Sequence, residues 1–101
     1  MNEKVRLEDL ITFSASGPSK REVHRGTDFN VLVIGLDAKQ EIPAHYEGYN
    51  VFFYVVSGKG KFTLHNQEVE LGPGEMVYSP AGERGIVALE RLTLLGVQEP
   101  H

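Results

Sequence analysis

His45 and Glu47 are the residues whose types and spacing point most directly to chemistry. They lie two positions apart, just after Pro43, which favours an extended backbone before it. Residues i and i+2 of a strand share a face, so imidazole and carboxylate are expected side by side. The pair could coordinate a divalent first-row metal such as iron, manganese, nickel or zinc. It could also act in acid–base catalysis, with His45 as the proton acceptor oriented by Glu47, or form a simple hydrogen-bonded pair.

Other chemistries find no support in the sequence. The chain has no cysteine, which excludes disulfides, thiolate nucleophiles and cysteine-based zinc or iron–sulfur sites. Ser57 and Ser79 lack the context of a nucleophile elbow. His65 and Gln67 are expected to be turn residues facing solvent. The net charge of −4 and the scattered basic residues argue against nucleic acid or a membrane surface as a partner.

Short β-prone segments, separated by glycine and proline, must position these side chains. The most β-prone run is 51–56, and a tight turn at 57–60 joins it to a partner strand at 61–65. Further strands are expected at 20–25, 28–36, 41–47, 68–71, 76–79, 86–89 and 91–98. Residues 5–13 are expected to form a short turn or strand, because no segment has the length and periodicity of a stable helix. The pattern predicts one all-β domain over residues 1–101.

The N-terminus alternates charge and lacks the apolar run of a signal peptide. No apolar stretch approaches the roughly 20 residues that cross a bilayer. A soluble cytoplasmic protein is therefore expected.

Two stretches of the chain, 35–58 and 74–85, resemble the two sequence motifs of cupins. The first motif places His-x-His, a glutamate and a glycine at fixed gaps, and the second is Gly-x5-Pro-x-Gly-x2-His. The glycine and proline frame is intact at Gly58, Gly74, Pro80 and Gly82. The resemblance covers about residues 30–97 and is to very small single-domain cupins. It implies a cupin-type double-stranded β-helix, a jelly-roll barrel, with residues 1–29 as N-terminal strands.

The resemblance also implies four metal ligands that point into the barrel. His45 occupies the first position, and Glu47 replaces the second histidine with a residue that could still coordinate. The glutamate position falls on Val51 and the histidine of the second motif falls on Gly85, and neither can bind a metal. Two protein ligands hold a metal weakly, so the expected cofactor is none or a weakly bound divalent metal.

Valine and glycine at these two positions would make the barrel interior drier and leave space where a side chain stood. The side chains expected to point inward are Val51, Phe53, Val55, Val77 and Val87. Polar groups at one end of the pocket would be His45, Glu47, Tyr49, Tyr78 and Arg84, a composition typical of a small-molecule site. Arg84 could bind a ligand carboxylate through two hydrogen bonds. For a loop arginine, exposure to solvent or pairing with Glu83 is the commoner role, and it is the role favoured here.

The function expected from the sequence is binding of a small organic ligand, whose identity the sequence does not specify. The ligand-binding residues would be His45, Glu47, Tyr49, Val51, Phe53, Tyr78 and Arg84. The alternative is a metal-dependent cupin enzyme of the sugar-isomerase or dioxygenase type, using His45 and Glu47 with non-standard further ligands. A homodimer is expected, because small cupins commonly pair through their sheets and the outward apolar positions of 28–36 and 92–97 need cover.

Overall fold

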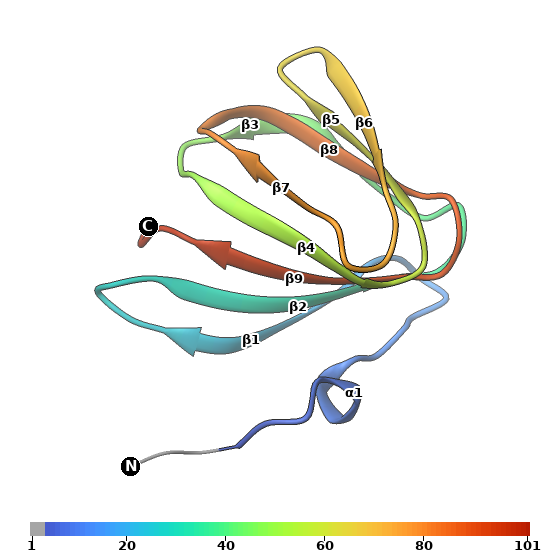
Figure 1. Ribbon diagram of the computed structural model, residues 1–101, viewed down its shortest axis with the longest axis horizontal. Helices are drawn as coiled ribbons and strands as arrows, with labels where there is room; N and C mark the ends of the chain where they lie inside the picture. Colours follow the sequence, from blue (N-terminus) through green and yellow to red (C-terminus); the bar gives the residue numbers. More distant parts are fainter. Residues whose placement is uncertain (1–3) are drawn as a thin grey trace.

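Nine antiparallel strands form two sheets that face each other in the computed structural model, which describes residues 4–101 (Figure 1). The five-stranded sheet has the order β1-β2-β9-β4-β7, and the four-stranded sheet has the order β3-β8-β5-β6. In chain order the strands are β1 (Ser19–Arg25), β2 (Asn30–Leu36), β3 (Glu41–Glu47), β4 (Val51–Ser57), β5 (Gly60–Leu64), β6 (Gln67–Leu71), β7 (Met76–Ser79), β8 (Gly82–Ala88) and β9 (Leu92–Gln98). This confirms the all-β architecture that the segment pattern predicted.

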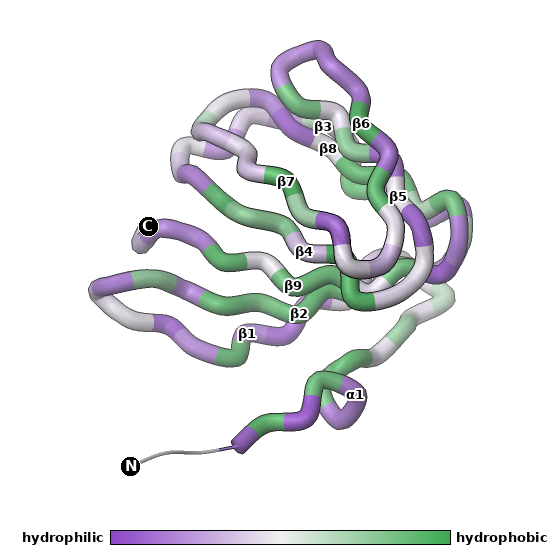
Figure 2. Tube along the Cα trace, viewed as in Figure 1, coloured by the Kyte–Doolittle hydropathy of each residue, from purple (hydrophilic) through white to green (hydrophobic). Residues whose placement is uncertain are grey.

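Strand β4 shows why the two sheets enclose a core. Its inward residues Val51, Phe53 and Val55 are buried, whereas the alternate residues Phe52 and Tyr54 are exposed. This two-residue period is the pattern of a strand with one face on a core and one face on solvent. Figure 2 shows apolar stretches along β2, β9 and β4, at the centre of the five-stranded sheet.

The core joins the two sheets through aromatic and branched aliphatic side chains. The rings of Phe53 on β4 and Phe62 on β5 lie 5.6 Å apart in a tilted arrangement. The buried core comprises Ile34, Leu36, Val51, Phe53, Val55, Phe62, Leu71, Ile86, Ala88, Leu92 and Leu94. Burying these side chains is the main favourable contribution to folding.

The structure shows why the first motif has a glycine at position 58. Its φ of 85° lies in the region that favours glycine, and a Cβ there would lie 1.8 Å from the carbonyl oxygen of Arg91. The β4–β5 turn can therefore pass close to the chain before β9 only because this residue has no side chain.

Three details differ from the expectations. Residues Leu7–Leu10 form one helical turn, α1, which is the only helix in the part of the chain described; it is far too short to cross a membrane. Strand β8 begins at Gly82, four residues earlier than expected, because Gly82 pairs with Glu47 of β3. The inward placement of Val87 is wrong: Ile86 and Ala88 enter the core, and Val87 pairs with Glu41 and Lys61 on the outer face.

Candidate functional site

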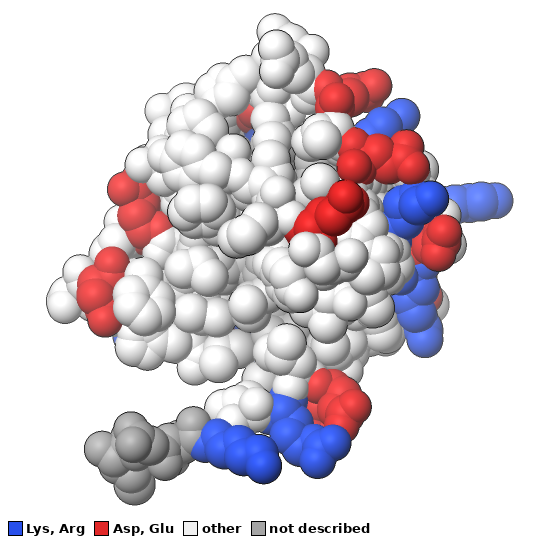
Figure 3. Space-filling model, viewed as in Figure 1, with Lys and Arg blue, Asp and Glu red and all other residues white. Residues whose placement is uncertain are grey.

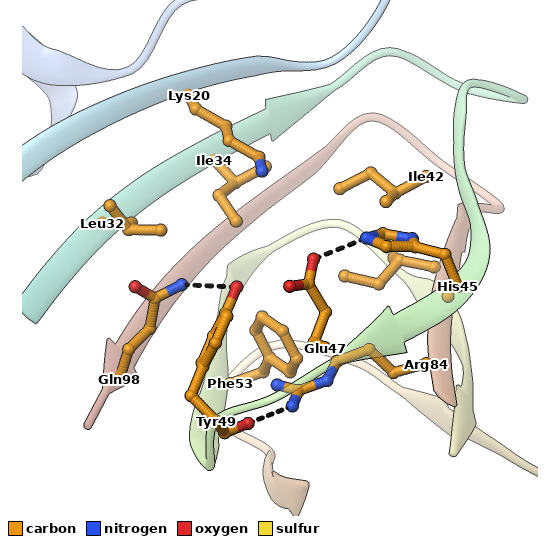
Figure 4. A pocket seen from close by; sticks show the side chains of 12 residues that line it. Lys20, Leu32, Ile34, Ile42, His45, Glu47, Tyr49, Phe53, Arg84 and Gln98 are labelled. Atoms are coloured by element: carbon orange, nitrogen blue, oxygen red, sulfur yellow. Dashed lines mark hydrogen bonds and ion pairs between the residues drawn. The ribbon is translucent and has the colours of Figure 1, made fainter. Parts of the chain in front are cut away.

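A pocket opens between the two sheets beside β3, with walls from both sheets (Figure 4). Its apolar walls are Leu32, Ile34, Ile42, Phe53 and Ile86. Its polar side chains are Lys20, His45, Glu47, Tyr49, Arg84 and Gln98. The enclosed volume is about 40 Å³. Since one water needs roughly 10–15 Å³ on this measure, the cavity holds a few waters or one small chemical group.

A β-bulge in β3 gives the pocket its polar mouth. Ile42 pairs with Ile86 and His45 pairs with Arg84, so two residues of β3, Pro43 and Ala44, lie opposite the single residue Gly85. Ile42 and His45 are three positions apart and would face opposite sides of a regular strand. The extra residue brings them to the same side, and both line the pocket. Pro43 lacks a backbone N–H. It is tolerated because β3 is an edge strand, where a residue without an N–H need not break a hydrogen bond to a neighbouring strand.

His45 and Glu47 form a hydrogen-bonded pair at this mouth. Nε2 of His45 lies 2.5 Å from Oε1 of Glu47, and Nδ1 lies 2.8 Å from the carbonyl oxygen of Pro43. Both ring nitrogens therefore face acceptors, an arrangement that favours the doubly protonated imidazolium. The Pro43 carbonyl first, and the Glu47 carboxylate second, raise the pKa of His45 above its usual value.

Arg84 points into the pocket from β8 and is only 5% exposed. Its Nη2 donates to the carbonyl oxygen of Tyr49, and its guanidinium carbon lies 5.0 Å from the centre of the Tyr49 ring. Within residues 4–101, Nε and Nη1 have no hydrogen-bond partner. Burial lowers the pKa of Arg84, yet an arginine remains charged at neutral pH. The alternative of a loop arginine in solvent is therefore wrong for this residue.

Tyr49 connects Arg84 to the end of β9. Its hydroxyl accepts a 3.3 Å hydrogen bond from Nε2 of Gln98, whose Oε1 lies 3.0 Å from Nε2 of His101. The rings of Tyr49 and His101 stack in parallel with centroids 3.8 Å apart. Burial, followed by the charge of Glu47, raises the pKa of Tyr49, so its hydroxyl stays protonated at neutral pH. These contacts hold the tyrosine ring in place beside the guanidinium.

The donors present do not match the metal site that the cupin resemblance implies. Val51 is a core residue with 1% exposure. At Gly85 a Cβ would lie 2.8 Å from the backbone of Ala44, so the expected space is in fact filled by the bulge of β3. Among residues 4–101, no three His, Asp or Glu side chains are grouped closely enough to hold a metal. Catalytic zinc sites use three protein ligands, and here only His45 and Glu47 are available.

Five of the seven residues expected to bind a ligand line this one pocket: His45, Glu47, Tyr49, Phe53 and Arg84. Val51 lies in the core instead of on the pocket wall. Tyr78 lies on the outer face of the five-stranded sheet, where its ring is 5.0 Å from that of Phe52.

Lys20 and Gln98 also line the pocket and were missed in the sequence. Gln98 continues the alternate inward positions of β9 that contain Leu92 and Leu94, so counting by twos along that strand would have found it. For Lys20, on the edge strand β1, no pattern in the sequence indicates a role.

Comparison with known proteins gives a family match and several structural likenesses. Residues 32–84 match the family model described as Cupin domain. An RmlC-like cupin protein from Desulfovibrio desulfuricans has a TM-score of 0.89 at 19% identity, with all of both chains covered. A conserved protein of unknown function from Streptococcus pyogenes has a TM-score of 0.85 at 20% identity, covering 100% of this chain and 90% of that one.

KdgF from a Halomonas species has a TM-score of 0.79 at 22% identity, covering 85% of this chain and 81% of that one. No curated protein sequence matches the chain. At these identities the likenesses concern the fold alone, and they confirm the expected jelly-roll barrel.

Proposed function

From the premise that this chain belongs to the cupin family, we propose that its barrel pocket binds a small organic molecule without a tightly bound metal. One observation carries the proposal: five apolar side chains and a few convergent polar groups line a single partly enclosed cavity. Such a composition is usual for small-molecule sites. Because the enclosed volume is about 40 Å³, the cavity takes one end of the ligand and the remainder extends through the mouth beside Ile42 and His45.

Acid–base catalysis by His45 receives less support. A general base needs a ring nitrogen that can reach the proton of a substrate. Both nitrogens of His45 are already paired, one with Pro43 and one with Glu47. The metal-dependent enzyme would need at least one further protein ligand beside His45 and Glu47. The two positions from which cupins would supply it are Val51 and Gly85.

The test begins with a screen of small organic molecules by ligand-observed NMR on the metal-free protein. Hits are then titrated against His45→Ala and His24→Ala. The two histidines are matched: their side chains are 50% and 46% exposed, and each pairs with a carboxylate, Glu47 and Asp28 respectively. We expect His45→Ala to weaken binding at least about tenfold, since it removes a ring that lines the pocket and leaves the Glu47 carboxylate there without its partner. His24→Ala should leave ligand affinity unchanged, because His24 lies outside the pocket.

Because both histidines are about half exposed, both variants should fold, which circular dichroism will verify. If every hit binds the His45→Ala variant as tightly as the parent protein, the ligand does not use this mouth and the proposal fails.

A further inference from the structure

Arg84 has hydrogen-bond donors that no atom of the described residues accepts. Its Nε bears one hydrogen and its Nη1 bears two, and these atoms have no acceptor within residues 4–101. The residue is 95% buried, so bulk water does not surround these groups. A buried charged donor without a partner is costly, and such groups are rare in folded proteins. An acceptor that enters the pocket would remove that cost.

The guanidinium is fixed in place before any ligand arrives. Nη2 is held by the carbonyl oxygen of Tyr49, and the Tyr49 ring packs against the guanidinium. That ring is itself stacked on His101, and the Tyr49 hydroxyl accepts a hydrogen bond from Gln98. A donor that is already oriented loses little conformational entropy on binding.

The charges around Arg84 favour an anion. Glu47 is the one carboxylate among the residues lining the pocket, and it is paired with His45. Lys20 extends its Nζ towards the same pocket from β1 (Figure 4). Apart from the Glu47–His45 pair, the charges lining the pocket are therefore positive.

We infer that the ligand is a small organic carboxylate and that Arg84 is the residue that anchors it; the inference rests on the proposed function above. A planar carboxylate matches the fork of parallel N–H groups that Nε or Nη1 forms with the second hydrogen of Nη2, whose first hydrogen is donated to the Tyr49 carbonyl oxygen. The enclosed volume of about 40 Å³ accommodates a carboxylate group, and Ile34, Ile42 and Ile86 offer apolar contacts to its hydrocarbon part. A phosphate would leave further oxygens unpaired against these apolar walls. In this barrel an arginine thus supplies the positive charge that a metal ion would supply in a cupin with all four metal ligands.

The experiment follows the Nε–H signal of Arg84 by NMR on protein labelled with ¹⁵N-arginine. The probes are propanoate and benzoate, their neutral amides propanamide and benzamide, and inorganic phosphate. Arg84 is the buried arginine of the described chain, and its signal is assigned by its loss in Arg84→Lys. We expect at least one carboxylate to shift this signal saturably, whereas its amide and phosphate leave it in place.

Variants then measure the contribution of the guanidinium. Arg84→Gln removes the charge, and Arg84→Lys keeps the charge but loses the fork. Both should weaken carboxylate binding at least about tenfold, as expected for hydrogen bonds between charged groups. Arg91→Gln is the control, because Arg91 is an exposed arginine bonded to Asp37 outside the pocket. Should the Arg84 variants not fold, the signal is assigned in the parent protein by its nuclear Overhauser contacts to the Tyr49 ring, and its shift still decides the matter.

The outcomes separate this inference from the function on which it rests. If the amides bind in the pocket as tightly as the acids, or if the acids bind without moving the Arg84 signal, the pocket remains a ligand site and the carboxylate inference is overturned. Preference for phosphate would overturn it as well. If neither these probes nor the screened molecules bind in the pocket, both proposals fail.

Discussion

His45 lies between two acceptors, and that arrangement determines its titration. The Pro43 carbonyl oxygen and the Glu47 carboxylate both raise its pKa above the usual value of about 6.5. A raised pKa in the folded state means that the pairing stabilises the protein fully below the unfolded pKa of about 6.5. That stabilisation is lost as the pH rises through the higher folded pKa. Since the side chain is half exposed, solvent screening keeps the contribution small.

An NMR titration of the His45 ring protons checks this account. We expect a midpoint above about 6.5 in the parent protein. In Glu47→Gln the midpoint should fall, because the carboxylate charge is lost while the hydrogen bond to Pro43 remains. A midpoint that is ordinary in the parent protein, or unchanged by Glu47→Gln, would contradict the pairing.

Spacing alone predicted the His45–Glu47 pair, because residues two apart share a face of any regular strand. It could not predict that this face points inward, since that depends on the bulge at Pro43 and Ala44. Arg84 is among the residues expected in the pocket, but the sequence favours a solvent-exposed loop arginine, because it does not reveal that β8 begins before this residue.

At the scale of the strands, the bulge of β3 and Gly85 opposite it form one structural unit. Gly85 lies against the backbone of Ala44 and Ile42, and two residues of β3 can face it because it has no side chain. The glycine at this position and the inward turn of His45 and Glu47 are therefore parts of the same local structure.

Gly85→Ala should destabilise the protein by about 1–3 kcal/mol, because the added Cβ has to displace backbone instead of a flexible side chain. Gly48→Ala is the matched control in the neighbouring loop. Its Cβ would meet only ordinary contacts, 3.7 Å or more from the Tyr46 ring, so its effect should stay within about 0.5 kcal/mol. Urea unfolding measures both. Equal stabilities for Gly85→Ala and the parent protein would show that the bulge does not need a bare backbone there.

Strands with clear alternation and turn residues at both ends could be predicted almost to the residue, as β4 and β7 show. The side that β8 presents to the core could not. Ile86, Val87 and Ala88 are all apolar, so composition does not distinguish the inner positions from the outer one. The helical turn α1 was missed because four residues carry too little periodicity to distinguish it from another turn.

At the scale of the whole molecule, the outer face of β4 and β7 carries an apolar patch formed by Phe52, Tyr54, Met76 and Tyr78. Figure 3 shows few charged side chains over the central part of this view, where these strands lie. On β2 the outward residues Val33 and Gly35 are buried, and Thr12 and Phe13 lie against Gly35. The uncovered apolar surface is thus centred on β4 and β7. The sequence alone predicts it at the outward positions of 28–36 and 92–97.

We propose that the protein forms a homodimer through this patch, at the β7 edge of the five-stranded sheet. Light scattering at micromolar concentration should give the mass of a dimer. Met76→Glu and Tyr78→Glu should shift it towards the monomer, because a buried unpaired charge opposes association. Tyr46→Glu serves as the control, since Tyr46 is an exposed aromatic residue on β3 in the other sheet. A monomeric parent protein would overturn the proposal.

The central claim is that the pocket functions with Arg84 and the His45–Glu47 pair and without a resident metal. The most direct measurement is elemental analysis of the native protein, purified without chelators and without added metal. The account predicts iron, manganese, nickel and zinc far below stoichiometric amounts, because the described chain brings only two suitable donors together. A transition metal in stoichiometric amount that is retained through dialysis would contradict it.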